Sequence, residues 1–321
     1  MPLLSRLIPS ALPPPPPHIS DRYRVIEPDA LDRLKASLLH HFFNDSTGGY
    51  LESQQGREDL ENHLRLRLHQ DRHEVVPWLD ATRSLDGSRI LEIGCGTGSS
   101  TVALAEQGSI VTGLDIDASA MQVAHDRSAE YKVQTQLIVG NATDAEKLLP
   151  GQSFDWIIFY ASLEHMIHEE RLSALQMAWR MLPPDGLLSV IETPNRLWYF
   201  DDHTSLLPFF HWLPDDLAMK YARMSPRPGF SDVYAEDIEE RRIHFLRRGR
   251  GVSFHEFQLS LGPTLNVVSS MQSFQRRTRR GRQLRWTLSR DWLYQKLLIR
   301  FSPIKHDGFF EPYLYLTIQK G

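Results

Sequence analysis

The chain has 321 residues, of which 41% are hydrophobic and 24% are charged, as in an ordinary globular protein of one large domain or two small ones. Cys95 is the single cysteine, which excludes an internal disulfide, and no apolar run approaches the roughly eighteen residues of a membrane-spanning helix. The formal net charge of −4 hides an asymmetry, because arginines crowd residues 241–300. A single cysteine favours a reducing compartment, and we expect the cytoplasm.

The amino-terminal segment is rich in proline. Met1–Leu12 is apolar but interrupted by Pro2 and Pro9, so it lacks the unbroken apolar core of a signal peptide. The run Pro13–Pro17 predicts a stiff polyproline II stub, either in a disordered leader or as the ligand of a proline-binding partner. We expect residues 1–20 to form a disordered, proline-rich leader.

Two helical stretches follow the leader. Apolar residues recur at helical spacing from Pro28 to Phe43 and again through Arg57–Leu79, with Thr47-Gly48-Gly49 between them. These helices either pack against the edge of a sheet or lie over a ligand cleft. We expect residues 21–86 to form an amino-terminal helical cap.

Strands and helices alternate from Ser88 onward, which predicts a parallel sheet. The expected helices are Ser99–Gln107, Ser119–Tyr131 and Glu169–Met181. The expected strands are Arg89–Ile93, Ile110–Leu114, Gln136–Val139, Phe154–Phe159, Leu187–Glu192, Asn266–Ser269 and Tyr313–Ile318. The resulting domain covers residues 87–321, with inserts at 194–250 and 271–303.

A glycine-rich turn follows the first strand, in the stretch Glu92-Ile93-Gly94-Cys95-Gly96-Thr97-Gly98. Its three glycines leave the turn without side chains, so a ligand can lie directly against the backbone. The free amides at the start of the next helix face the same ligand. Such turns, at the carboxyl ends of strands, bind nucleotide-like ligands in open α/β sheets. Cys95 itself is expected to be a small buried residue.

Two acidic residues narrow the class of ligand. Asp115 ends the second strand, about twenty positions after the turn, where a carboxylate can bind a ribose diol. A dinucleotide site would have a third glycine where Ser99 stands. Glu92 suits a ligand with a cationic end better than a pyrophosphate, which its carboxylate would repel.

These features resemble the first motif and the ribose-binding acid of the class I S-adenosylmethionine-dependent methyltransferases. The resemblance is good from Ser88 to Pro194 and thin elsewhere. It implies a Rossmann-like α/β fold with a seven-stranded, mostly parallel sheet, and S-adenosyl-L-methionine as the cofactor. The cofactor contacts that it implies are Glu92, Gly94, Cys95, Gly96, Gly98, Asp115, Ile116, Asn141, Ala142 and Tyr160.

Later motifs occur in the order typical of this family. Asn141-Ala142 stands where the family has an acid–alanine pair, and the Asn141 amide oxygen can still accept from an adenine amino group; alternatively, Asn141 is only a turn residue. Phe154-Asp155 precedes an apolar strand, and Glu164-His165 follows it, as in quinone-precursor and small-molecule O-methyltransferases. The turn Pro183-Pro184-Asp185-Gly186 matches the family's turn before its fifth strand.

Two histidines are candidates for the general base. A hydroxyl acceptor must lose its proton as it attacks the methyl group, and an imidazole that titrates near neutrality suits this task. His165 has the better match to the family and is the first candidate, and His203 is the second. Otherwise His165 only packs or hydrogen-bonds beside Glu164.

The first insert combines aromatic and polar residues, as an acceptor pocket would. We expect it to contribute the substrate-binding residues Asn195, Arg196, Trp198 and His211. Its aromatic residues can instead form a small core of their own. Asp201, Asp202 and His203 are the alternative ligand set for a divalent ion, but no further ligands complete it, so no metal is assigned.

The second insert is basic. It holds Arg276, Arg277, Arg279, Arg280, Arg282, Arg285 and Trp286, followed by the apolar and basic stretch Trp292–Phe301. This composition suits an anionic membrane surface, a phosphorylated substrate or, third, nucleic acid; it is also typical of a solvated face. No RNA-binding motif accompanies it.

The sequence therefore predicts transfer of a methyl group to an oxygen of a small-molecule, sugar or lipid-like acceptor. Three alternatives remain: an NAD(P)-linked oxidoreductase, an RNA methyltransferase that uses the basic insert, and a non-catalytic partner subunit. We expect a cytoplasmic protein, peripheral to the membrane if the basic insert binds lipid. No residue identifies the acceptor or the oligomeric state.

Overall fold

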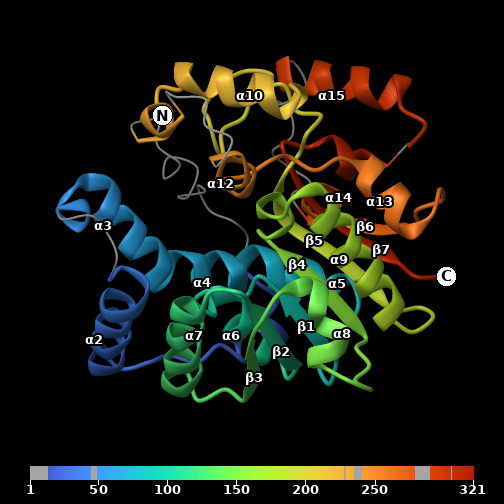
Figure 1. Ribbon diagram of the computed structural model, residues 1–321. Helices are drawn as coiled ribbons and strands as arrows, with labels where there is room; N and C mark the ends of the chain where they lie inside the picture. Colours follow the sequence, from blue (N-terminus) through green and yellow to red (C-terminus); the bar gives the residue numbers. More distant parts are fainter. Residues whose placement is uncertain (1–13, 45–48, 228, 235–240, 279–289, 305) are drawn as a thin grey trace. The chain divides into compact units, whose positions relative to one another are not determined.

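A seven-stranded sheet organises the computed structural model, which describes residues 14–44, 49–227, 229–234, 241–278, 290–304 and 306–321 (Figure 1). The strands are hydrogen-bonded in the order β3-β2-β1-β4-β5-β7-β6. The sheet is mostly parallel, and β7 (Tyr313–Gln319) runs antiparallel to β5 and β6. The expected α/β fold, with its last two strands at the far edge, is confirmed. The chain divides into two compact units, the first ending at Ile157 and the second beginning at Ile158.

The first unit begins with helices. The α-helices are α1 (Pro17–Ser20), α2 (Pro28–Ser37), α3 (Gln54–Glu61), α4 (Arg67–Gln70) and α5 (Val76–Thr82). Wider π-helical turns occupy Leu38–Phe42, Asn62–Leu66 and Asp71–Val75, so residues 54–82 form one helical run, as the periodicity predicts. Of the expected leader, residues 1–13 lie outside the described residues, and Ile19 in α1 is buried.

The strands of the first unit form a parallel arrangement. They are β1 (Arg89–Ile93), β2 (Ile110–Asp115) and β3 (Thr135–Val139), and β4 (Trp156–Tyr160) crosses the boundary between the units. The helices between them are α6 (Ser99–Ala105), α7 (Ala118–Glu130) and α8 (Ala145–Leu148). Asp117 begins α7, because its Oδ1 accepts from the amides of Ser119 and Ala120 at 2.8 and 3.1 Å.

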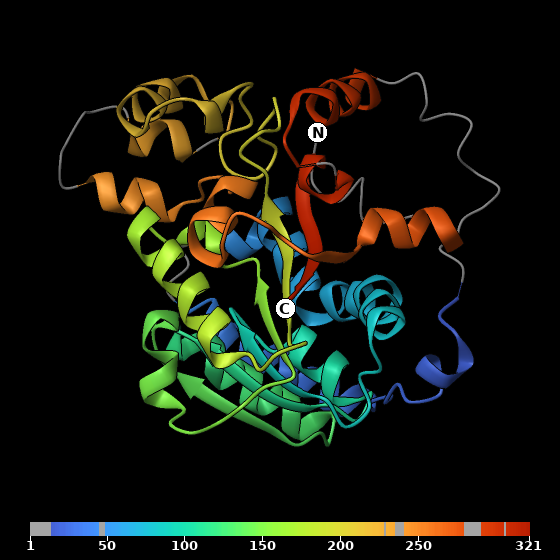
Figure 2. The same cartoon turned by 90° about the vertical axis from the view of Figure 1, so that its right-hand side faces the viewer.

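The second unit contains the remaining strands and the two inserts. Its strands are β5 (Leu187–Pro194), β6 (Val267–Ser270) and β7, and Figure 2 shows β5 beside β7. Its helices are α9 (His168–Met181), α10 (Asp215–Tyr221), α11 (Phe230–Val233), α12 (Arg242–Arg247), α13 (Phe254–Leu261), α14 (Met271–Thr278) and α15 (Arg290–Phe301). Short 3-10 turns occupy Tyr50–Glu52 and Ala142–Asp144 in the first unit, and Leu163–His165, Phe210–Trp212, Ala222–Met224 and Asp307–Phe310 in the second.

The first insert has a small core of its own, which is the alternative that we considered for its aromatic residues. The core packs Phe210, Phe230, Tyr234 and Phe245 edge to face, and each of these side chains is buried. In the second insert, Arg279, Arg280, Arg282, Arg285 and Trp286 lie outside the described residues.

A bulge interrupts β5 near its carboxyl end. Val190 pairs with Leu316 of β7, but Thr193 pairs with Leu314, so β5 holds one more residue than its partner between these pairs. Glu192 lies inside the bulge with φ +59°, a left-handed backbone conformation that is uncommon for a residue with a side chain. The bulge sets the direction of every side chain that follows it.

Candidate functional site

The glycine turn has the backbone that its sequence predicts. Gly94, Gly96 and Gly98 have φ of +86°, +49° and +81°, which only glycine adopts at little cost. A Cβ at Gly98 would lie 2.9 Å from Cα of Ala124 in α7, so this glycine permits close packing of α7. A Cβ at Gly96 would meet nothing within 4 Å, so this stretch of backbone faces open space.

Glu92 lies beneath the turn and is fully buried. Its two carboxylate oxygens accept from the hydroxyl groups of Ser100 and Thr101 in the first turn of α6, the latter at 2.6 Å. Burial raises the pKa of Glu92 to about 7, against the effect of these two hydrogen bonds. In this arrangement the carboxylate fastens β1 to α6, and its expected contact with the cationic end of a ligand stays a prediction.

Asp115 stands at the end of β2 and is half-buried. Its Oδ2 accepts from the amide of Gly96 at 2.8 Å, and its Oδ1 accepts from the amide of Asp117 at 2.9 Å. The structure thus brings the predicted ribose acid against the glycine turn. Ile116, the next predicted contact, is 68% exposed.

The other predicted contacts of the first unit are packed or hydrogen-bonded locally. Asn141 Oδ1 accepts from the amide and the hydroxyl of Thr143 at 3.0 and 2.9 Å, which is the turn role that its sequence allows. Ala142 is buried. Cys95 is buried with its sulfur 3.4 Å from that of Met121, and burial raises the pKa of its thiol.

His63 and Arg127 join the helical run to the glycine turn, and the sequence analysis missed both. The guanidinium of Arg127 is buried and donates to the carbonyls of Thr97, His63 and Leu64 at 2.8, 2.6 and 3.3 Å. His63 Nδ1 lies 3.3 Å from the Thr97 hydroxyl, and burial lowers the pKa of His63 to about 3. A signal existed, because Arg127 falls on the same helical face as Ala120, Val123 and Ala124.

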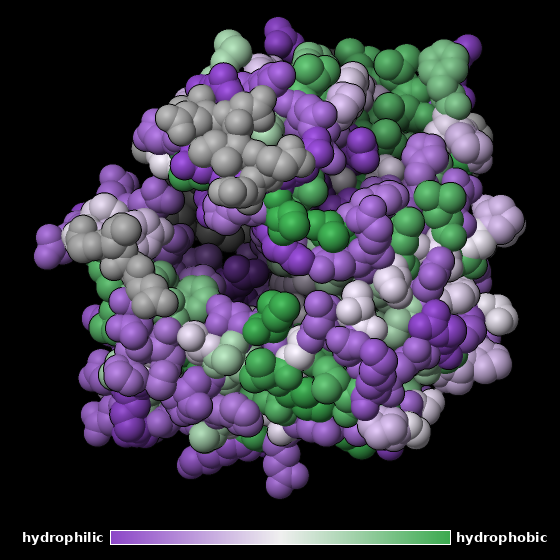
Figure 3. Space-filling model, in the orientation of Figure 1, coloured by the Kyte–Doolittle hydropathy of each residue, from purple (hydrophilic) through white to green (hydrophobic). Residues whose placement is uncertain are grey.

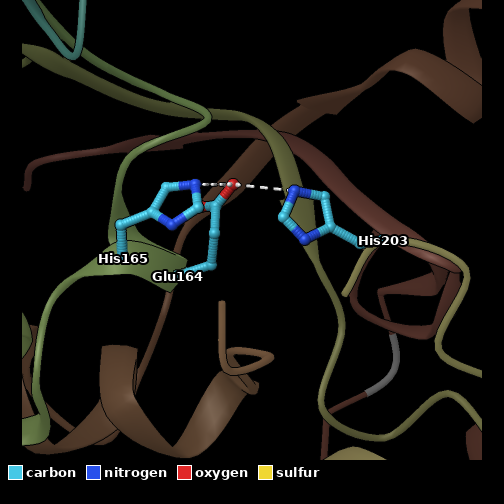
Figure 4. A group of neighbouring side chains, drawn as sticks. All are labelled: Glu164, His165 and His203. Atoms are coloured by element: carbon cyan, nitrogen blue, oxygen red, sulfur yellow. Dashed lines mark ion pairs between the residues drawn. The ribbon is translucent and has the colours of Figure 1, made fainter. Parts of the chain in front are cut away.

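In the second unit, Glu164, His165 and His203 converge (Figure 4). Glu164 Oε1 lies 3.9 Å from His165 Nε2 and 4.0 Å from His203 Nε2. The Glu164 side chain is fully buried, and those of His165 and His203 are 45% and 27% exposed. Burial lowers the pKa of His203, and the Glu164 carboxylate opposes this shift. The two predicted base candidates therefore face one carboxylate.

The remaining predicted residues of the second unit are mostly buried. Tyr160 ends β4, Trp198 packs against Tyr294, and Asn195 donates to the carbonyls of Phe309 and Glu311 at 2.8 Å each. His211 Nε2 lies 3.2 Å from Asp201 Oδ1. The contacts of Trp198 and Asn195 join the first insert to α15 and to the segment before β7, whereas the His211–Asp201 contact lies within the insert.

Arg196 differs from these residues because it lines a cavity of about 540 Å³. The cavity has a largely apolar wall and two histidines. It is lined by His168, Arg196, Leu197, Trp212, Ser253, His255, Glu256, Leu259, Tyr294 and Leu298. Of the four residues predicted to bind the acceptor, only Arg196 borders this space.

The alternative metal ligands Asp201 and Asp202 have other partners. Asp201 accepts from the amides of His203, Thr204 and Ser205. Asp202 Oδ1 accepts from the hydroxyl of Tyr313 at 2.8 Å. The set Asp201, Asp202 and His203 is therefore not arranged around a common point, whereas Glu164, which the sequence analysis left without a role, faces both histidines.

Comparisons with known proteins identify a domain. Residues 90–186 match the family model of the methyltransferase domain. A ubiquinone biosynthesis O-methyltransferase of Pseudomonas putida is 32% identical over 128 residues, which make up 39% of this chain and 53% of that protein. A 27-O-demethylrifamycin SV methyltransferase of Amycolatopsis mediterranei is 30% identical over 165 residues, 50% of this chain and 53% of that protein. The chain thus spans about half the length of the curated relatives it matches.

Solved structures overlap this chain in part. A magnesium protoporphyrin IX methyltransferase from Synechocystis PCC 6803 with bound S-adenosylmethionine has a TM-score of 0.37 and 21% identity, covering 50% of this chain and 77% of that chain. A structure from Rickettsia typhi in complex with S-adenosylhomocysteine has a TM-score of 0.46 and 14% identity, covering 76% of this chain and 52% of that chain.

Proposed function

We propose that this chain, whose residues 90–186 match the model of a methyltransferase domain, transfers a methyl group from S-adenosyl-L-methionine to an oxygen of a small-molecule, sugar or lipid-like acceptor. The observation that carries the proposal is the open, left-handed backbone at Gly96 held by Asp115. The O-methyltransferases that the domain resembles support oxygen as the acceptor atom.

The first unit would bind the cofactor. Gly94, Gly96 and Gly98 leave the backbone free to lie against it, and Asp115 offers a carboxylate for its ribose hydroxyls. When bound, S-adenosylmethionine supplies an electrophilic methyl group on a sulfonium. Glu92 would keep the turn in place from beneath and present negative potential toward the cationic end. Within residues 21–86, the helices around His63 would cover the turn as a cap.

The second unit would bind and activate the acceptor. The loop after β4 places His165, and the loop after β5 places His203, as the first and second candidates for the base. A neutral imidazole can take the hydroxyl proton as the new carbon–oxygen bond forms. Replacing the true base by Asn is expected to lower kcat at least about tenfold with cofactor affinity unchanged. If His165→Asn and His203→Asn both keep the parent rate, neither histidine is the base.

A matched pair of glycine substitutions tests the cofactor site. Gly96 and Gly87 have φ of +49° and +76°, and a Cβ at either would meet nothing within 4 Å. Alanine is therefore strained at both positions by about 1–2 kcal/mol, but only at Gly96 does it enter the space assigned to the cofactor. We expect Gly96→Ala to weaken S-adenosylhomocysteine binding at least about tenfold, and Gly87→Ala to bind like the parent.

Titration calorimetry with S-adenosylhomocysteine and with NADH measures this prediction, and thermal melting compares the two variants. Parent protein that binds NADH and not S-adenosylhomocysteine would establish the oxidoreductase alternative. If the two variants bind S-adenosylhomocysteine with equal affinity, the glycine turn is not part of the cofactor site.

The helix α15 supports peripheral association with an anionic membrane. Leu293, Leu297 and Phe301 recur every four residues along α15 and are 60%, 52% and 76% exposed. Hydrophobic residues gather over the region of α15 in Figure 3. No helix among the described residues is long and apolar enough to cross a membrane. We place the protein in the cytoplasm, where its single cysteine would stay reduced.

A further inference from the structure

Three potential metal ligands in the second unit converge on one point without a hydrogen bond between them. Figure 4 shows the rings of His165 and His203 on either side of Glu164 Oε1. One ligand atom from each of Glu164, His165 and His203 lies within 4.8 Å of the other two. Although it is buried, Glu164 Oε1 has no hydrogen-bond partner. An unpartnered buried carboxylate oxygen needs a cation or a donor, because leaving it bare is costly.

The other nitrogen of each ring is already engaged. His165 Nδ1 lies 2.8 Å from the carbonyl of Arg247, which can only accept, so Nδ1 carries the proton in the neutral ring. His203 Nδ1 lies 3.0 Å from the Thr204 hydroxyl, whose own hydrogen is donated to the carbonyl of Gly249 at 3.2 Å. In both neutral rings the lone pair is therefore on Nε2, which faces the carboxylate. Histidines that bind metals are oriented in the same way, by a hydrogen bond from the other ring nitrogen.

The rest of the structure holds Glu164 in this position. Thr193 donates its hydroxyl hydrogen to Glu164 Oε2 at 3.1 Å, and the bulge at Glu192 aims Thr193 inward. The backbone carbonyl of Glu164 accepts from the amide of Arg250 at 2.9 Å. One carboxylate oxygen is thus fixed from behind while the other, Oε1, points at the two imidazoles.

The spacing suits an ion better than a proton. At 3.9 and 4.0 Å, the two nitrogen–oxygen distances exceed any hydrogen bond. Ligand atoms about 2.0–2.2 Å from one ion are separated from each other by roughly 3–3.5 Å. A movement of roughly half an ångström, small for the partly exposed rings of His165 and His203, closes the site.

We propose that Glu164, His165 and His203 bind a divalent transition-metal ion such as Zn²⁺. Two imidazole nitrogens and one carboxylate oxygen are a ligand set for such ions, whereas Mg²⁺ and Ca²⁺ prefer oxygen alone. Three protein ligands leave at least one position open. Among the described residues, this is the one group of three or more His, Cys, Asp and Glu side chains with such spacing.

The role of the ion rests on the proposed methyl transfer. An acceptor hydroxyl in the open position would lose its proton to water more readily, because the ion stabilises the alkoxide or phenoxide. That oxygen then forms its bond to the methyl carbon while the carbon–sulfur bond breaks and leaves its electron pair on sulfur. With the ion bound, His165 and His203 would be its ligands, and the ion would take over the activation of the hydroxyl that the proposed function assigns to a histidine base.

Metal binding can be measured without knowledge of the acceptor. Chain without a polyhistidine tag is stripped with a chelator and titrated with Co²⁺, whose visible absorption reports coordination, and then with Zn²⁺. We expect one Co²⁺ per chain, displaced by Zn²⁺, with affinity lowered at least about tenfold in Glu164→Gln and in His165→Gln. His165 is the safer test of folding, because its side chain is 45% exposed.

The matched control is His125→Gln, an exposed histidine of α7 outside the cluster, which should bind Co²⁺ like the parent. Absence of saturable binding to the parent, Mg²⁺ binding without a Co²⁺ spectrum, or parent-like affinity of both ligand variants would each overturn the site. S-adenosylhomocysteine binding is measured on the same samples. A parent that binds Co²⁺ as expected but not S-adenosylhomocysteine would support the metal site and refute the methyltransferase proposal.

Discussion

Glu92 gives the protein a pH-dependent term in its stability. Its pKa is about 7 in the folded chain and near 4.5 in the unfolded chain. Between these values the folded state holds a proton that the unfolded state has released, so the free energy of unfolding falls as the pH rises and then levels off. A shift of this size corresponds to roughly 3 kcal/mol.

Glu92→Gln removes the titrating group and keeps its shape. We expect the unfolding free energy of the parent minus that of the variant to fall by roughly 3 kcal/mol from pH 4.5 to pH 7.5. Urea denaturation at the two pH values measures the difference, and circular dichroism checks that the variant is folded. A difference that stays constant or grows with pH would contradict the raised pKa of Glu92 in the folded chain.

At the scale of elements, the π-helical turn Asn62–Leu66 and α7 are joined by one cation. Arg127 of α7 donates to two carbonyls of this turn and to Thr97 of the glycine turn. Burial lowers the pKa of Arg127 to about 10, which still leaves the guanidinium charged at neutral pH. Three segments far apart in the sequence therefore depend on a single side chain.

Arg127→Met should destabilise the chain strongly. Methionine fills similar volume but removes the hydrogen bonds of the guanidinium to three carbonyls, and we expect a loss of at least about 3 kcal/mol in urea denaturation. The matched control is Arg33→Met, since Arg33 also links to α7, through Glu130, but from an exposed position where ion pairs contribute little. Equal losses in the two variants would show that the buried contacts are not the important ones.

The exposed apolar residues Leu293, Leu297 and Phe301 of α15 predict binding to lipid vesicles. Lys296 and Arg300 accompany the apolar residues of this helix, so anionic vesicles should retain the protein better than neutral ones, and less well at high salt. In vesicle co-sedimentation we expect the double variant Leu297→Ser, Phe301→Ser to pellet less than half as well as the parent. Val25→Ser, at a residue 93% exposed in the first unit, is the control.

If neither type of vesicle pellets the parent, α15 is not a membrane-binding helix. Retention of RNA at physiological salt by the same protein would then favour the nucleic-acid alternative for the basic insert.

At the scale of the whole molecule, periodic features were predictable. Each of the seven expected strands overlaps an observed one, because buried strands are short apolar runs between turns. The glycine turn was predictable as well, since positive φ values favour glycine, which is visible in the sequence. The burial of Ile19 in α1 was harder to foresee, because it depends on tertiary neighbours.

Contacts between distant loops were not predictable in this way. Glu164 Oε1 and His203 Nε2 lie 4.0 Å apart only because the segments after β4 and β5 follow particular paths, and loops carry no periodic signal. Asn195 shows the same limit. Its residue type and position suit a polar pocket, but its side-chain amide donates to the backbone carbonyls of Phe309 and Glu311. The sequence thus indicates which residue types are available, and tertiary structure decides their partners.

The extra residue in β5 has a consequence for how this protein can change over time. Before the bulge at Glu192, successive side chains of β5 point to alternate faces of the sheet. After the bulge the alternation continues, but it is shifted by one residue relative to β7. Deleting one residue there would turn Thr193 and Pro194 to the opposite faces and leave Glu164 without its donor. The length of this strand should therefore stay fixed as the sequence changes.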